Sequence, residues 1–254
     1  MAKKMLKMFA SCVCSVTLAT AWLAGTAAAQ EPAPASSASY VPSDKELAAA
    51  NCVIGEERFL PGDYYYCLGG MTYGEHNYAQ SNRFFTTAAS WASKPAQYVL
   101  GVMALNGDHQ PKNRSLALAW FALASERPDS RFKAPYEEAY RASTPAERRA
   151  ADVLLEKMRP IYGDATAAVR AEKRYADGMA MLNRLNVGGN LYCMEGMSTM
   201  ANLNSDPSQC MPTQQVVKTV DRASVNVFEG WAGHVTVGDL QQVPAAAKSS
   251  SGTN

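Results

Sequence analysis

The sequence is poor in the residues and motifs that carry most enzyme chemistry. Its 254 residues include only 3 histidines, and none of these lies in a His-Glu-x-x-His pattern. It also has no Gly-x-Ser-x-Gly turn, no phosphate-binding loop and no dinucleotide-binding glycine pattern. These absences argue against the common metalloproteases, serine esterases, P-loop nucleoside triphosphatases and dinucleotide-dependent dehydrogenases. We therefore expect a protein that is not an enzyme and that carries no cofactor.

The sequence also lacks a large excess of charge and, after its first residues, a long apolar run. Residues 1–29 predict a secretory signal peptide, with Lys3, Lys4 and Lys7 before an apolar stretch and Ala27–Ala29 as the cleavage site. Removing these three of the 24 basic residues leaves 21 against 23 acidic ones, too balanced for a nucleic-acid partner. We expect a periplasmic or secreted bacterial protein with no membrane span after cleavage.

Cysteines are few, and two of the six fall in the predicted signal peptide. The four that remain are Cys52, Cys67, Cys193 and Cys210. An even number in an exported protein predicts disulfides, with three possible connectivities. Sequence proximity favours pairing the first two and the last two, each closing a loop that contributes about 3 kcal/mol in the chain-entropy model. Free buried thiols are the alternative, whereas the lack of a Cys-x-x-Cys pair argues against zinc.

Composition divides the rest of the chain into four parts. Residues 30–42 are rich in Ala, Pro and Ser and predict a disordered leader, and residues 244–254 predict a disordered tail. Residues 43–189 carry helical signals, whereas residues 190–243 combine a Cys- and Met-rich loop with β-branched runs. The sequence thus predicts a mainly α protein with a small β-rich C-terminal appendage.

Local patterns predict where several elements begin and end. Ser43 and Thr144 each precede a glutamate by three residues, which is the capping-box pattern of a helix start. We expect Asp164 to cap a long Ala-rich helix that Gly188 and Gly189 close. The strands are predicted in three β-branched runs, at 216–220, 225–228 and 234–237.

One pattern occurs twice in the helical region, at 66–90 and again at 96–125. A Leu-Gly pair is followed by a glycine-containing turn and then by an aromatic pair with alanines. A third, weaker copy begins at Tyr175. The positions that we expect to be structural are Leu68, Gly69, Gly74, Leu100, Gly101, Gly107, Trp120, Phe121 and Ala124. The small residues would let two helices approach closely, and the aromatic residues would fill the space between neighbouring pairs.

This pattern resembles the Sel1-like repeat, a relative of the tetratricopeptide repeat. The resemblance covers about 65 residues, and it departs from the family in loop length and in the Pro111–Asn113 approach to the second helix. It implies a short stack of α-hairpins, capped by flanking helices. It also implies a non-catalytic scaffold that holds a protein or a cell-envelope component in a concave groove.

Three segments could instead bind a metal. Gly74–Asn77 and Gly107–Gln110 each place a carboxylate beside an imidazole, although turns also use such residues for the backbone. Residues 193–211 hold the densest group of sulfur-containing side chains, which are Cys193, Met194, Met197, Met200, Cys210 and Met211. Thioethers suit Cu(I), which gives an alternative function of periplasmic copper binding, whereas a disulfide-closed loop with packed methionines needs no metal.

Overall fold

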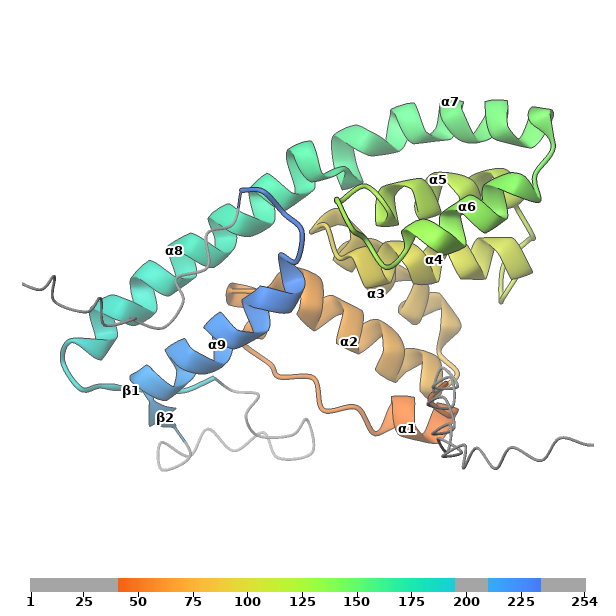
Figure 1. Cartoon of the computed structure of the whole chain (residues 1–254). Helices are drawn as coiled ribbons and strands as arrows, with labels where there is room; N and C mark the ends of the chain where they lie inside the picture. The colour runs from red at the N-terminus through yellow and green to blue at the C-terminus, as the bar shows by residue number, and fades with distance from the viewer. Residues whose placement is uncertain (1–40, 195–209, 234–254) are drawn as a thin grey trace, which may run out of the picture. The chain divides into compact units, whose positions relative to one another are not determined.

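The computed structural model describes residues 41–194 and 210–233 and shows a mostly helical chain (Figure 1). The predicted signal peptide, most of the leader, the tail and the strand at 234–237 lie outside the described residues. The elements are α1 (Asp44–Ala48), η1 (Glu56–Arg58), α2 (Pro61–Gly74), α3 (Tyr78–Ser90), α4 (Lys94–Asn106), α5 (Arg114–Ala124), α6 (Lys133–Arg141), α7 (Pro145–Tyr162), η2 (Asp164–Ala168), α8 (Val169–Asn186), β1 (Leu191–Tyr192), β2 (Met211–Pro212) and α9 (Thr213–Val227).

Two helical hairpins form the first part of this fold, α2 with α3 and α4 with α5. Their shared core contains Phe85, Leu100, Trp120 and Leu123, and Met158 of α7 closes it from the other side. Helix α6 packs against α5, and α7 lies along α5 (Figure 1). The predicted helical organisation of this region is therefore confirmed at the level of helix pairs.

Helix α8 continues from α7 and leads to a second apolar cluster. The join is η2, a π-helical turn, and Figure 1 shows α7 and α8 following one another along one side of the molecule. Helix α9 and strand β1 pack against α8, and β2 packs against β1 and α9. Phe59 and Leu60, which precede α2, join Leu182, Val216 and Phe228 in this cluster. The N-terminal and C-terminal segments are thus tied together around α8.

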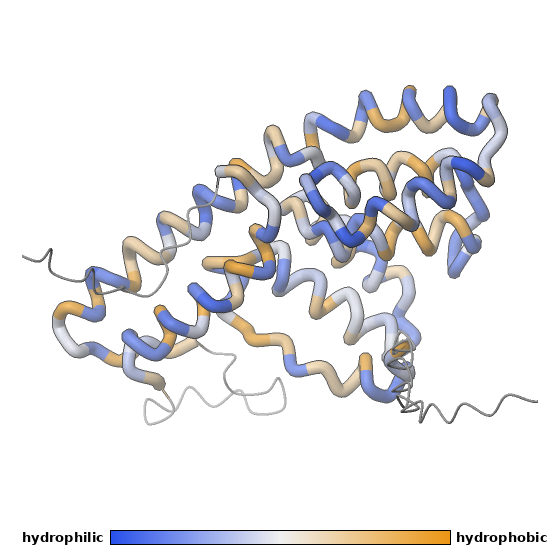
Figure 2. The backbone as a smooth tube through the Cα atoms, in the orientation of Figure 1, coloured by the Kyte–Doolittle hydropathy of each residue, from blue (hydrophilic) through white to orange (hydrophobic). Residues whose placement is uncertain are grey.

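The prediction of strands at 216–220 and 225–228 is wrong, because the first run lies in α9 and the second forms its end, with Phe228 as the C-cap. Val216, Val220 and Ser224 are buried at helical spacing, and this face packs on α8. Figure 2 shows apolar and polar positions alternating along α9 in the way that an amphipathic helix requires. Burial of the valine face outweighs the β preference of branched side chains. The only strand pairing in the described residues is antiparallel, with Leu191 opposite Pro212.

The helix starts agree with the sequence at two positions and differ at a third. Both capping boxes form, at Ser43 with Glu46 and at Thr144 with Glu147. Asp164 does not cap α8, because that helix begins after the π-helical turn and the Asp164 carboxylate turns inward to buried cations.

No helix within 41–194 or 210–233 combines the length and apolar character that crossing a bilayer requires.

Candidate functional site

Each of the two helical hairpins contains the same kind of close contact, between a glycine of its first helix and a phenylalanine ring of its second. A Cβ atom on Gly69 would lie 2.6 Å from the ring of Phe85, and a Cβ atom on Gly101 would lie 2.5 Å from the ring of Phe121. A tyrosine three residues before each glycine packs on the same ring, with centroids 5.8 Å apart in the first pair and 5.5 Å in the second. Both hairpins are therefore closed by the same arrangement of residue types.

This contact predicts that replacing a glycine by alanine affects stability differently at Gly101, which lies under a ring, and at Gly70, which does not. Gly101→Ala should destabilise the protein, because overpacking costs about 1–3 kcal/mol and outweighs the gain in helix propensity. Gly70→Ala should be neutral or stabilising, because its Cβ would meet only Leu47 Cδ2 at an ordinary 3.7 Å. Urea unfolding of both variants checks this, and equal free energies of unfolding would contradict it.

The other repeat positions occupy defined places, with one departure from expectation. Gly107 ends α4 in the left-handed region at φ 74°, as a turn requires. Trp120 lies between pairs and meets Tyr162 of α7 edge to face at 4.8 Å. Phe121 packs inside its own hairpin rather than only between hairpins. Of the remaining expected positions, Leu68, Leu100 and Ala124 are buried in the core, and Gly74 is buried at the end of α2 against α1.

The weak third copy keeps its glycine contact but changes the partner. A Cβ on Gly178 in α8 would lie 2.5 Å from the ring of Phe59, which comes from the segment before α2. Tyr175, three residues earlier, packs on Phe228 after α9 at 5.7 Å. The tyrosine and the glycine of this copy therefore contact rings from two different segments.

A groove of about 460 Å³ runs between α4 and α6. Its apolar lining comes from Tyr98, Val102, Leu105, Phe121, Pro135, Ala139 and Ala142. Its polar lining comes from Asn106, Lys112, Arg114 and Glu138. Arg114 is held in place, because its Nη2 donates to the Ala142 carbonyl at 2.7 Å and its Nε lies 3.3 Å from Glu147. The arrangement suits an apolar segment with an acidic group at one end.

A second pocket, of about 360 Å³, lies where the starts of α2 and α4 meet the end of α9. Its lining includes acidic and basic side chains in equal number, which are Asp63, Asp129, Glu229, Lys94, Arg127 and Arg131. Burial raises the pKa of Asp63. Lys94 and Arg127 also belong to a buried ion network, so this pocket adjoins a structural junction.

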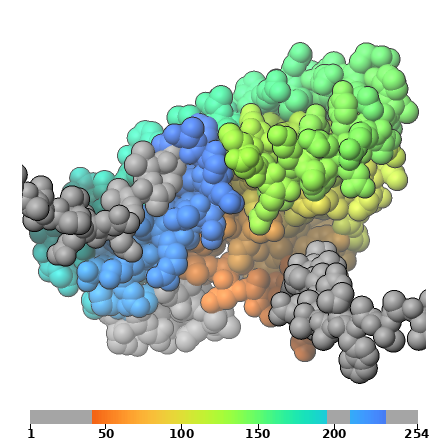
Figure 3. Space-filling model, viewed as in Figure 1, coloured from red at the N-terminus to blue at the C-terminus, as the bar shows by residue number. Residues whose placement is uncertain are grey.

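The buried network centres on Asp164, and no sequence pattern indicated it. Lys94 Nζ lies 2.9 Å from one Asp164 oxygen and 3.2 Å from Glu126, while Arg127 Nε donates to the other Asp164 oxygen at 3.0 Å. Arg127 Nη1 donates to the carbonyls of Val227 and Glu229 at 2.8 and 3.0 Å. Figure 3 shows the blue surface of α9 meeting the yellow-green segment that follows α5. The network therefore fastens α9 to the helical hairpins.

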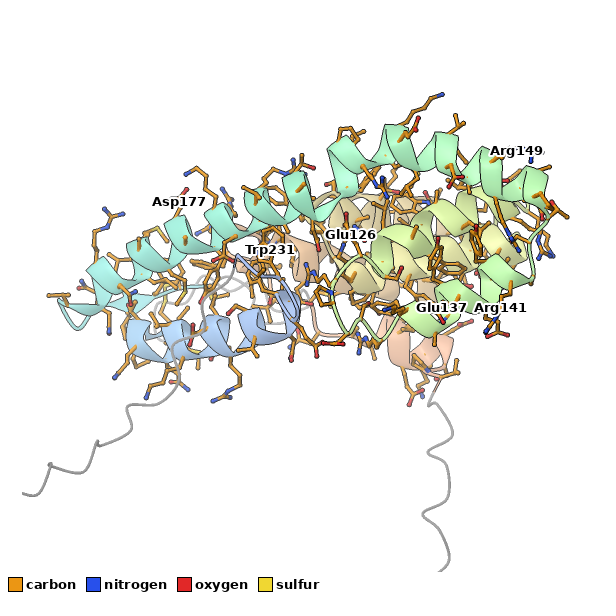
Figure 4. The ribbon with its side chains drawn as sticks, turned by 45° about the horizontal axis from the view of Figure 1, so that its top comes forward. Glu126, Glu137, Arg141, Arg149, Asp177 and Trp231 are labelled. Carbon is orange, nitrogen blue, oxygen red and sulfur yellow. A yellow bond between two sulfur atoms is a disulfide. The ribbon has the colours of Figure 1, made fainter. Side chains whose placement is uncertain are left out.

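Burial lowers the pKa of Lys94, and the Asp164 and Glu126 carboxylates oppose that effect. The Lys94 ammonium also donates to the Leu123 carbonyl at 2.8 Å. Figure 4 labels Glu126, which lies where α5 ends near the α7–α8 join. Each charge in this junction thus has an opposite charge or a carbonyl beside it, as buried ions require.

The structure brings together the two turns that the sequence suggested for a metal, but tyrosines link them. The ring of Tyr78 stacks on His109, and its hydroxyl lies 2.8 Å from His76 Nδ1. Tyr73 donates to Asp108 at 2.7 Å, and Asp108 also lies 3.2 Å from His109 Nε2. Within the described ranges, no group of three or more His, Cys, Asp or Glu side chains is placed to hold a metal ion.

This aromatic cluster predicts an unusual tyrosine titration. Burial, together with the hydrogen bond to Asp108, raises the pKa of Tyr73 to about 12. A raised pKa means that the stability contribution of this group is present below about pH 10 and lost as pH rises through about 12. Ultraviolet titration of the tyrosinate signal should show one fewer late-titrating group in Tyr73→Phe, and an unchanged late phase would contradict the assignment.

The four cysteines form the two disulfides that proximity favoured, Cys52–Cys67 and Cys193–Cys210. Met194 and Met211, beside the second bridge, pack against the apolar cluster of α8 and α9. Met197 and Met200 lie outside the described residues. The bridge leaves no thiolate at these positions for a soft metal.

We expect the oxidised protein to retain no Cu(I) against a competing chelator. With Cys193 and Cys210 bridged, thioethers alone would have to bind the ion. Copper content after desalting measures this in oxidised and in reduced protein. Stoichiometric copper in the oxidised form would revive the metal-binding alternative.

No family model, curated protein or solved structure matches this chain.

Proposed function

We propose that this protein is an exported, non-catalytic protein-binding module built from Sel1-like helix pairs. The observation that carries the proposal is the repeated closure of both hairpins by a glycine under a phenylalanine ring, with a tyrosine on the same ring. A fold that repeats one hairpin serves to extend a surface, and the α4–α6 groove provides such a surface.

The two disulfides support export, since such bridges persist in oxidising compartments. The buried charges of Lys94, Arg127 and Asp164 support a structural role for their network, because each has an oppositely charged partner from another segment. We infer a partner that is a protein or another component of the cell envelope.

Affinity capture tests this function directly. The full chain, purified after export with its disulfides intact, is immobilised and exposed to a cell-envelope extract. A discrete partner retained by folded protein, and not by protein that has been reduced and alkylated, is expected. Retention of no partner, together with turnover in a panel of hydrolase substrates, would reverse the proposal.

A further inference from the structure

The first helices of the two hairpins, α2 and α4, can be aligned in sequence. The surroundings of a position in one helix can therefore be compared with those of the matching position in the other. Residues 66–71 read Tyr-Cys-Leu-Gly-Gly-Met and residues 98–103 read Tyr-Val-Leu-Gly-Val-Met. Gly69 and Gly101, which match in this alignment, make the same contact with a phenylalanine ring. Each position of α4 therefore corresponds to the α2 position that lies 32 residues earlier.

In the first hairpin, a short helix of the same chain covers one face of α2. A Cβ on Gly70 would lie 3.7 Å from Leu47 Cδ2, and a Cβ on Gly74 would lie 2.8 Å from Leu47 Cβ. The Asp44 carboxylate lies 3.8 Å from Nδ1 of His76, in the turn between α2 and α3. Helix α1 thus presents a leucine to the helix face and an acid to the turn.

In the second hairpin, the corresponding face lines a groove. Val102 and Asn106 correspond to Gly70 and Gly74, and both line the α4–α6 groove. The turn after α4 contributes Lys112 to the rim, and within the described residues its ammonium pairs with no carboxylate. The larger side chains hold an occupant farther from α4 than α1 lies from α2, and the volume of about 460 Å³ provides the room.

We propose that the α4–α6 groove binds a short helical segment of another protein, in which a leucine-sized apolar residue stands within one turn of acidic residues. This inference rests on the proposed function and names the chemistry of the partner. The apolar residue packs between Val102 and Ala139, and the acidic turn faces Lys112. The groove combines an apolar floor with two basic lining side chains, Lys112 and Arg114, against one acidic side chain, Glu138. This balance favours an apolar residue beside acidic ones over a basic or purely polar segment.

A second copy of the chain carries the same chemistry in its own α1. That helix is already engaged within its chain, through the Leu47 contact with α2 and the Asp44–His76 pair. A separate partner can fill the groove without first giving up such contacts. A partner segment is therefore the better-suited occupant.

The probe for this inference is a fluorescent peptide with the sequence of residues 43–49, held helical by a side-chain crosslink, and titrated with the full chain. Lys112→Glu should weaken its binding about fivefold to tenfold, because an attraction at the rim becomes a repulsion. Val102→Glu should weaken binding more than tenfold, because it places a carboxylate on the apolar floor. Lys133→Glu is the matched control, since Lys133 is exposed and lies outside the groove lining, and it should change binding less than twofold.

A photo-crosslinking amino acid at position 102 then identifies the occupant in the envelope extract, with position 137 as a control outside the groove lining on α6 (Figure 4). A crosslinked partner segment with an apolar residue among acids supports the inference. No saturable binding of the probe, or equal binding to Lys112→Glu and Lys133→Glu, overturns it.

The remaining outcomes separate this inference from the function on which it rests. A partner captured equally well by Val102→Glu overturns the groove assignment and leaves the protein-binding function intact. A crosslink from position 102 to residues 43–49 of a second copy overturns the separate partner in favour of self-association. Capture of no partner at all contradicts the proposed function itself.

Discussion

Asp164→Ala should lower the free energy of unfolding by about 3–5 kcal/mol, which is the usual cost of removing one partner from a buried ion pair. Asp164 is 6% exposed and lies between two buried cations, Lys94 at 5% and Arg127 at 7%. Without its carboxylate, Lys94 keeps a single carboxylate partner, Glu126, beside the Leu123 carbonyl, and Arg127 keeps only backbone carbonyls. The loss appears as a lower urea midpoint with an unchanged slope.

The matched control is Asp177→Ala, which breaks an exposed pair. Lys173 and Asp177 lie 2.8 Å apart on α8, but their side chains are 75% and 66% exposed, and Figure 4 shows Asp177 on the outer side of that helix. Such a pair contributes about 0–1 kcal/mol. Equal losses for the two variants would show that the Asp164 network does not carry the junction.

A double-mutant cycle separates the network from the general cost of a core substitution. Lys94→Met removes one cation and keeps a side chain of similar length, so Asp164 retains its pair with Arg127. We expect a coupling energy of about 0.5–3 kcal/mol between Lys94→Met and Asp164→Ala. Additive losses would mean that the two side chains act independently despite their separation of 2.9 Å.

Features that follow from local chemistry could be predicted from the sequence. The capping boxes at Ser43 and Thr144 satisfy helix N–H groups with side chains three residues away, so a short pattern determines them. The disulfides form between the nearest cysteines, as loop-closure entropy favours. The glycines of the hairpins were also found, because close helix contact leaves no room for a side chain.

Features that depend on distant parts of the chain could not be predicted. Lys94 begins α4 and Asp164 follows α7, so the whole of α4 to α7 separates them in sequence, and nothing near either residue indicates the other. In the sequence, Asp164 resembles a helix cap, because it follows Gly163 and precedes a helical segment. Only the fold shows that its carboxylate turns inward. Helix α9 could not be predicted for a different reason. Its valines recur at helical spacing, but their branched side chains favour strands in isolation. Contact with α8 decides in favour of the helix.

The largest effect on the core should come from Trp120→Ala, which we expect to cost about 3–5 kcal/mol. Trp120 is 7% exposed and joins the α4–α5 hairpin to α7 through Tyr162 and Met158. Trp91→Ala is the control, because Trp91 is only partly buried and contacts Arg170 across its ring at 5.3 Å. Its loss should be clearly smaller. Urea unfolding measures both variants, and Trp120→Phe should recover part of the loss by keeping an aromatic contact with Tyr162. If Trp120→Ala unfolds at the wild-type midpoint, α7 is not held by this ring, and the packing of α7 on α5 must rest on the aliphatic contacts around Met158 instead.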